Sequence, residues 1–99
     1  MKVVVTDEAW VDLLKIAREI AKDNPSRANS FLSELYDRCL QLGDMPKAYP
    51  LLPSKEQAGI RRRPYGNYLI FYRVTDQAVE VLHVLHGARD YEKILFPEE

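Results

Sequence analysis

The chain has 99 residues, of which 46% are hydrophobic and 29% are charged, and its formal net charge is −1. This composition is typical of a folded globular protein, and the length predicts a single domain over residues 1–99 and excludes a disordered chain. No apolar run approaches the roughly 20 residues of a membrane helix. The N-terminal residues also lack the apolar core of a signal peptide, so we expect a cytoplasmic protein.

The charge is distributed unevenly along the chain. Residues 55–73 contain 5 basic and 1 acidic side chains, whereas residues 74–99 contain 2 basic and 6 acidic ones. A dedicated nucleic-acid binder carries a broad basic stripe, and this chain has only a local one. We therefore expect no direct sequence-specific DNA binding. The single cysteine, Cys39, excludes an internal disulfide and a cysteine-based zinc site, and its apolar helical position favours a core role.

The first half of the chain predicts a short strand followed by two helices. Residues 2–5 contain three consecutive β-branched valines, and Thr6 or Asp7 can cap the helix that follows. Apolar residues then recur at spacings of three and four, which predicts one buried helical face made of Trp10, Leu13, Leu14, Ala17, Ile20 and Ala21. Asn24 and Pro25 end this helix and start the next.

The second helix should stop near Gly43. Its predicted apolar face consists of Ala28, Phe31, Leu32, Leu35, Tyr36, Cys39 and Leu42. Two helices joined so tightly predict an antiparallel hairpin. Three prolines then predict an irregular loop over residues 44–59, in which Tyr49, Leu51 and Leu52 attach the loop to the core.

The last third of the chain predicts three antiparallel strands and a short tail helix. The strands cover residues 60–65, 68–74 and 79–86, with turns between them, and Pro64 indicates that the first of them lies at a sheet edge or ends there. Residues 88–95 can form about two helical turns. The order β-α-α-β-β-β predicts an α+β two-layer sandwich, with the helical hairpin packed on a mainly antiparallel sheet and a short C-terminal helix.

Residues 79–90 form the most distinctive stretch of the chain. An apolar strand ends abruptly at His86 and Gly87, which gathers His86, Arg89 and Asp90 where the strand stops. His83 and His86 are three residues apart, so they should lie on opposite faces of a regular strand and cannot bind a metal together. Each is more simply explained as a hydrogen-bonded structural histidine.

The arginine triplet 61–63 has two interpretations. Alternation places Arg61 and Arg63 on one face of the strand and Arg62 on the other, so at least one face should be wet. Paired guanidinium groups suit recognition of phosphate or carboxylate, whereas arginines on an edge strand also discourage unwanted strand pairing. Arg73 interrupts an apolar strand and needs water or a carboxylate, for which Glu80 is a candidate.

The sequence contains no motif for a nucleotide, flavin or zinc cofactor, and we expect neither a cofactor nor a metal. A metal-free ribonuclease needs a base, a cationic phosphate clamp and an acid. The residues that could supply these roles are Arg61, Arg73, His86, Arg89 and Tyr91. Many small sheets with arginines would meet this condition.

Nearly the whole chain resembles the RelE/ParE superfamily of toxins from bacterial type II toxin-antitoxin systems. The most specific blocks are G-I-R-R-R-P-Y-G-N-Y-L-I-F-Y-R-V and V-L-H-V-L-H-G-A-R-D, and the second is similar to the ParE branch in particular. The resemblance implies a toxin that inhibits growth and is neutralised by a directly bound, ParD-like antitoxin in a hetero-oligomer.

Two targets follow from the resemblance. ParE-like members poison DNA gyrase without an active site of their own, whereas RelE-like members cut messenger RNA on the ribosome. The slightly acidic chain, without a cluster of lysines in its central strand, favours gyrase as the target. Tyr91 keeps the ribonuclease hypothesis open, and a third possibility is a toxin that only binds its antitoxin.

The resemblance also implies an antitoxin helix beside the helical hairpin and an extended segment beyond it. The candidate residues for contact with the antitoxin or the target are Trp10, Leu14, Phe31, Leu35, Arg61, Arg63, Arg73, Arg89 and Tyr91. Most of the apolar ones can equally pack on the sheet, so the contact surface should use residues at the rim of the groove. Acidic residues of the antitoxin would suit the basic strand.

Overall fold

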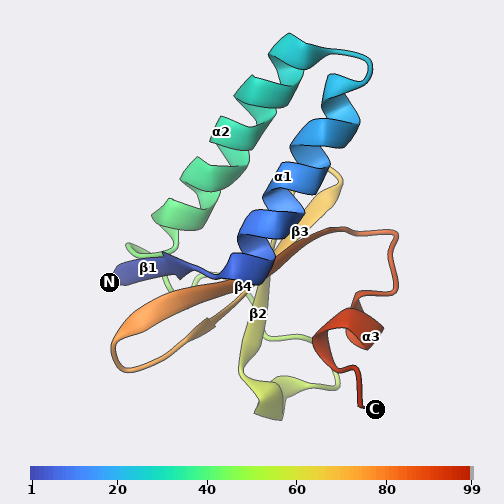
Figure 1. The fold of residues 1–99 in the computed structure, drawn as a ribbon. Coiled ribbons are helices and arrows are strands. Elements are labelled where there is room, and N and C mark those ends of the chain that lie inside the picture. Colours follow the sequence, from blue (N-terminus) through green and yellow to red (C-terminus); the bar gives the residue numbers. More distant parts are fainter. Residues whose placement is uncertain (99) are drawn as a thin grey trace.

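The computed structural model describes residues 1–98 as two layers, a four-stranded sheet and a helical hairpin (Figure 1). The elements are β1 (Lys2–Val5), α1 (Asp7–Ala21), α2 (Pro25–Gln41), the short 3-10 helix η1 (Glu56–Ala58), β2 (Ile60–Tyr65), β3 (Tyr68–Val74), β4 (Ala78–His86) and α3 (Tyr91–Leu95). The predicted α+β fold and element order are confirmed. No helix in this part of the chain is long and apolar enough to cross a membrane.

The strand order is β1-β4-β3-β2, with β1 parallel to β4 and the other pairs antiparallel. The prediction that β2 lies at an edge is confirmed. The loop before it covers part of that edge, because the Leu52 amide donates to the Ile60 carbonyl and the Arg62 amide donates to the Pro50 carbonyl. Pro64 has no amide hydrogen to leave unpaired there.

Both predicted helix caps form. The Thr6 hydroxyl accepts from the Ala9 amide, and the Asn24 side chain accepts from the Arg27 amide with Pro25 in the first turn of α2. Gly43 lies just after the end of α2, and a Cβ there would lie 2.3 Å from the Met1 carbonyl oxygen. The start of β1 can therefore approach the end of α2 closely.

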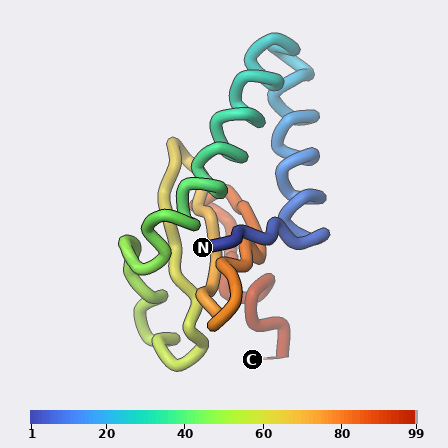
Figure 2. The backbone as a smooth tube through the Cα atoms, turned by 90° about the vertical axis from the view of Figure 1, so that its left-hand side faces the viewer, coloured from blue at the N-terminus to red at the C-terminus, as the bar shows by residue number. Residues whose placement is uncertain are grey.

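The helical hairpin packs on one face of the sheet. The buried residues between the two layers are Ala9, Leu13, Ile16, Leu35, Cys39, Leu42, Ile70, Tyr72, Val79, Val81 and Val84. Figure 2 shows that the far end of the hairpin projects beyond the strands. The sheet therefore covers only part of the length of each helix.

The predicted buried face of α1 is correct at Leu13, and at Ile20, which packs against the core, but it is wrong at Trp10 and Leu14. Ala9, Leu13 and Ile16 are buried, whereas Trp10 is 38% and Leu14 is 45% exposed. The apolar arc of α1 is wider than the strip that the sheet covers, and periodicity alone does not show which part of the arc is buried.

A second apolar cluster lies on the opposite face of the sheet. It contains the buried side chains of Leu52, Ile60, Phe71 and Leu85, and α3 packs against it. The predicted tail helix is shorter than expected, because residues 86–89 form a turn and the helix begins only at Tyr91. In this turn the Arg89 amide donates to the His86 carbonyl, and the Tyr91 amide donates to the Arg89 carbonyl.

Candidate functional site

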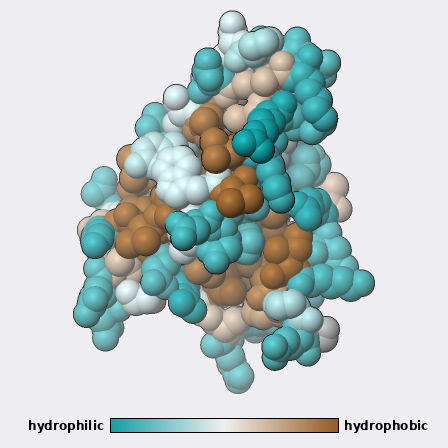
Figure 3. Space-filling model, viewed as in Figure 1, coloured by the Kyte–Doolittle hydropathy of each residue, from teal (hydrophilic) through white to brown (hydrophobic). Residues whose placement is uncertain are grey.

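The outer side of the helical hairpin carries an exposed apolar surface. Its large exposed members are Trp10, Val11, Leu14 and Leu40. The Trp10 ring stacks on Tyr36 of α2, with the ring centroids 5.2 Å apart, and so joins the two helices. We call these five residues the hairpin surface. Figure 3 shows hydrophobic and pale side chains exposed between the hydrophilic ones of the hairpin. Contiguous exposed apolar side chains on a monomer are typical of a protein-binding surface.

Trp10 and Leu14, which the sequence placed among the contact candidates, both lie on the hairpin surface. Leu35 does not, because it is fully buried between the hairpin and the sheet. Phe31 is partly buried between Tyr65 and Tyr68, at centroid distances of 5.8 and 5.6 Å. The sequence analysis missed Val11 and Leu40, because neither fits the single apolar face that it assumed for each helix.

The arginine strand is engaged within the fold, but only one of its three arginines is buried. Arg61 donates from Nη1 to the Tyr49 carbonyl at 2.7 Å. Arg63 is only 8% exposed and donates from Nη1 to the Arg38 carbonyl at 3.0 Å, with its guanidinium 5.0 Å from the centre of the Tyr49 ring. Arg61 and Arg62, on opposite faces of β2, both remain partly exposed.

Arg62 and Tyr91 connect β2 to α3 on the other face of the sheet. Arg62 donates from Nη1 to the Tyr91 hydroxyl at 2.9 Å, and the Tyr91 ring lies 5.0 Å from the Phe71 ring. Tyr91 therefore accepts a hydrogen bond as part of the packing of α3.

Arg73 pairs with Glu80, as the sequence suggested. Its Nε donates to Glu80 Oε1 at 2.7 Å, and the side chain is 52% exposed. An ion pair this exposed contributes little to stability. It neutralises Arg73 at the end of β3.

His86 and Arg89 lie together where β4 ends. The Ala88 amide donates to His86 Nδ1 at 3.0 Å, and the His86 ring meets Tyr68 edge-on at 5.3 Å. Both residues line a hollow beside α1 that also includes Asp12 and Lys15. Asp90, the third polar residue that the sequence placed here, lies apart from this hollow, 3.8 Å from Lys93.

The five candidate ribonuclease residues do not converge. Arg73 pairs in register with Glu80, whereas Tyr68 pairs with His86, so Arg73 and His86 lie at opposite ends of the β3–β4 ladder. Five residues of strand separate these ends by roughly 17 Å. Arg61 and Tyr91 lie on opposite faces of the sheet. Residues 1–98 also contain no group of three His, Cys, Asp or Glu side chains placed to hold a metal ion.

A bulge in β4 is a feature that sequence analysis missed. The register shifts between Phe71 and Tyr72, so Val81 and Val84 both face the helices although they are three residues apart. Asp12 of α1 holds this region through Oδ2, which lies 3.0 Å from the Val84 amide nitrogen and 2.7 Å from His83 Nδ1. A bulge leaves no periodic signal in the sequence.

Glu34 is the centre of a second polar cluster, between α2 and the tip of the β2–β3 hairpin. It accepts from Arg27 at 2.6 Å and from the Tyr65 hydroxyl, and Arg38 lies over the Tyr65 ring. These two hydrogen bonds, that from Arg27 first, hold the pKa of Glu34 below its ordinary value. The bond to Glu34 raises the pKa of Tyr65.

Cys39 has no place in a reactive site. It is fully buried, and burial raises the pKa of its thiol to about 12. The prediction that it is a core residue is confirmed.

A family model described as "ParE toxin of type II toxin-antitoxin system, parDE" matches residues 3–91. The chain belongs to the ParE toxin family. It is therefore the toxin of a type II toxin-antitoxin system, and an antitoxin is its partner. A search of curated proteins finds no match.

Solved structures of toxin-antitoxin systems share the fold of this chain. The chromosomal ParDE toxin-antitoxin system from P. aeruginosa matches with a TM-score of 0.76 and 18% identity over 87% of this chain and 95% of that one, which supports the fold. The toxin-antitoxin complex RelBE2 from Mycobacterium tuberculosis matches with a TM-score of 0.64 and 27% identity over 86% and 95% of the two chains. The suggested superfamily and its ParE branch are confirmed.

Proposed function

We propose that this ParE toxin blocks DNA gyrase in the cytoplasm by binding to it, and that a ParD-like antitoxin neutralises the toxin. The observation that carries the proposal is the contrast between two parts of the molecule. The hairpin surface offers exposed apolar residues to a protein partner, whereas the polar residues that hydrolysis would need lie apart. This combination favours a toxin that acts by binding.

The antitoxin would place the apolar side of an amphipathic helix on the hairpin surface. Leu14→Glu should weaken the complex with the ParD-like protein encoded beside the toxin by roughly a hundredfold, because a charge would replace an apolar contact near the centre of the surface. Lys22→Glu, at the far end of α1, is the matched control and should leave binding unchanged. The complex is measured by isothermal titration with purified partners.

The target is tested with a supercoiling assay. Purified toxin should inhibit gyrase, and equimolar antitoxin should restore supercoiling. If gyrase is unaffected while ribosome-bound message is cut, the gyrase proposal is wrong. If induced expression does not slow bacterial growth at all, both activities are excluded and only antitoxin binding remains.

A RelE-type, ribosome-dependent ribonuclease is the second candidate function. Two observations favour it: the likeness to the RelBE2 complex at 27% identity, and the cluster of His86 and Arg89 at the end of β4. His86→Ala separates the candidates. It should abolish message cleavage by a ribonuclease, whereas gyrase inhibition through a surface elsewhere should persist.

A further inference from the structure

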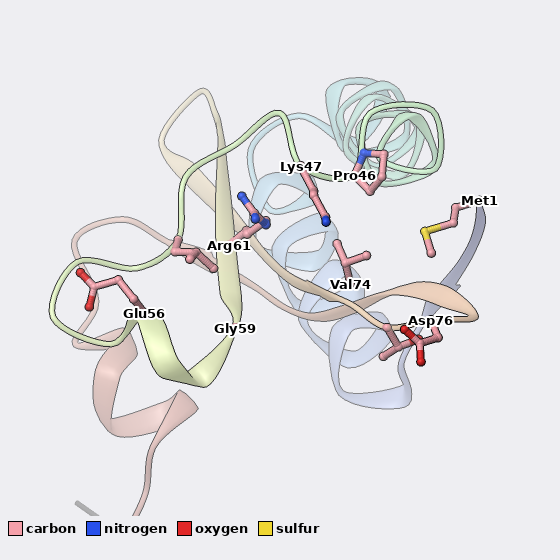
Figure 4. A pocket seen from close by; sticks show the side chains of 10 residues that line it. Met1, Pro46, Lys47, Glu56, Gly59, Arg61, Val74 and Asp76 are labelled. Atoms are coloured by element: carbon pink, nitrogen blue, oxygen red, sulfur yellow. The ribbon is translucent and has the colours of Figure 1, made fainter.

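A cavity of about 560 Å³ lies beyond the C-terminal end of α2, between the 44–59 loop, β2 and the β3–β4 turn (Figure 4). Its apolar wall consists of Met1, Pro46, Leu51 and Val74. Two cations, Lys47 and Arg61, and two acids, Glu56 and Asp76, complete the lining together with Gly59 and Thr75. The cavity is separate from the hairpin surface.

Arg61 is fixed at the wall of this cavity. It pairs in register with Tyr72, forms a bridge with Leu51 on its other side, and donates from Nη1 to the Tyr49 carbonyl. This leaves the remaining guanidinium donors without an acceptor among residues 1–98. A guanidinium held in this way presents a fork of donors that matches the two oxygens of a carboxylate.

Lys47 brings a second positive charge to the same space. Figure 4 shows that both side chains extend into this space, Lys47 from the 44–59 loop and Arg61 from β2. Neither side chain forms an ion pair with any residue from 1 to 98. Two cations that line one cavity without a counter-charge repel each other, and an anion bound there reduces this cost.

The two acids of the lining decide what kind of anion fits. Glu56 points away from the cations and accepts from the Ser54 amide at 3.1 Å, and Asp76 lies at the far side in the β3–β4 turn (Figure 4). The lining therefore has two positive and two negative side chains. A nucleic-acid backbone would meet the acids as well as the cations, whereas a single carboxylate can reach the cations alone.

We propose that this cavity receives the carboxylate of an Asp or Glu side chain from an extended segment of the antitoxin. The proposal rests on the proposed function, in which an antitoxin binds this toxin. The apolar wall would pack against the residues flanking that acid. The antitoxin segment would reach the cavity with this side chain and would not pair as a strand with β2, because residues 50–52 already cover the neighbouring edge of β2.

Charge reversal at Lys47 tests the proposal without endangering the fold, because this side chain is exposed and makes no ion pair with residues 1–98. Lys47→Glu should weaken the complex with the ParD-like protein roughly a hundredfold, and Lys47→Gln roughly tenfold. Lys22→Glu, with the same change of net charge at the far end of the hairpin, should bind like the wild type. Equal affinity of Lys47→Glu and wild type would overturn the proposal.

A suppressor selection identifies the occupant. Antitoxin variants that again neutralise the Lys47→Glu toxin should carry an Asp or Glu replaced by Lys or a neutral residue. If suppressors change only apolar positions, the cavity does not receive a carboxylate. If the wild-type toxin binds no ParD-like protein at all, the proposed function itself fails, and this outcome is distinct from a complex that ignores Lys47.

The chemical class of the anion is tested on the toxin alone. NMR titration of the Arg61 side-chain resonances with acetate should show saturable shifts that are lost in Lys47→Glu. Inorganic phosphate and a short single-stranded DNA serve as the competing probes. A stronger response to DNA than to acetate would contradict a carboxylate site.

Discussion

Where β4 extends beyond β1, the carboxylate of Asp12 accepts from two donors that have no partner in the sheet. β1 covers β4 only as far as Val81, and beyond that point Asp12 Oδ2 accepts from the Val84 amide. A carboxylate only accepts, so His83 donates to the same oxygen from Nδ1. Thr6 belongs to the same arrangement, since its hydroxyl donates to the Val81 carbonyl at 2.8 Å.

Asp12→Ala should therefore lower the free energy of unfolding by about 1–3 kcal/mol, because two donors that are mostly buried lose their acceptor. Asp37→Ala, at an exposed position of α2, should change stability by less than about 0.5 kcal/mol. Urea unfolding followed by circular dichroism measures both variants. Equal stability of the two would show that water replaces Asp12 at the bulge.

The cluster around Glu34 predicts how stability depends on pH. The folded pKa of Glu34 is lowered, so its contribution is present above the ordinary carboxyl pKa and is lost as the pH falls through the folded value. The folded pKa of Tyr65 is raised, so its contribution is present below the ordinary tyrosine pKa and is lost as the pH rises through the folded value.

Between these two pH limits, the contribution of the cluster to the free energy of unfolding should not change with pH. In Glu34→Gln, both dependences should weaken, and NMR titration should find the pKa of Tyr65 closer to that of a free tyrosine. An unchanged Tyr65 titration in Glu34→Gln would mean that burial, and not this hydrogen bond, sets the Tyr65 pKa.

Among the helices and strands, we expect α3 to be the element that unfolds most easily. It has five residues, none of them buried, yet it covers Phe71 and Leu85 on the outer face of the sheet. A helix this short has little stability of its own, so packing keeps it in place.

Ile94→Asp should detach α3, because Ile94 packs on the apolar cluster of that face. The backbone amides of residues 92–95 should then exchange with solvent deuterium severalfold faster, while far-UV circular dichroism stays close to that of the wild type. Glu92→Ala, at an exposed position of the same helix, is the matched control. Unchanged exchange in Ile94→Asp would show that Tyr91 and Phe96 hold the segment without Ile94.

Elements of this fold are predictable because their signals are local. Asn24 and Pro25 define the turn of the hairpin by themselves, and Pro64 marks the edge strand from its own chemistry. The arginine contacts are not predictable in this way. Arg61 and Arg63 bond carbonyls 12 and 25 residues away, and no spacing rule connects an arginine to a particular backbone oxygen.

The candidate site also has features that the sequence predicts and features that it does not. Trp10 and Leu14 were found as apolar helix residues, but their exposure depends on how the hairpin crosses the sheet. The separation of Arg73 from His86 follows from the β3–β4 register, which the short turn between these strands fixes and which the predicted Arg73–Glu80 pair already implied. Residue types and this local pairing were therefore readable from the sequence, whereas the grouping of residues from distant elements required the fold.

Across the whole molecule, the arginines of β2 and β3 bind other groups of the toxin, and this limits how the toxin can bind nucleic acid. Each residue of the triplet 61–63 donates to an acceptor within the fold, Arg73 pairs with Glu80, and the net charge is −1. Affinity for DNA grows with the number of cations that contact phosphates. The arginines of β2 and β3 are engaged within the fold, and basic side chains are outnumbered by acidic ones, 14 to 15.

The isolated toxin should therefore not shift a DNA duplex in a gel at micromolar concentration, even at about 50 mM salt, where phosphate contacts are strongest. The gyrase–DNA complex should still capture the toxin, because binding occurs through protein contacts. The matched control is Glu80→Gln, which frees Arg73 and adds one net positive charge, and a single added cation should not produce a shift either. A salt-sensitive shift by the wild-type toxin would mean that the arginines of β2 can contact nucleic acid. That result would favour RNA over gyrase as the target.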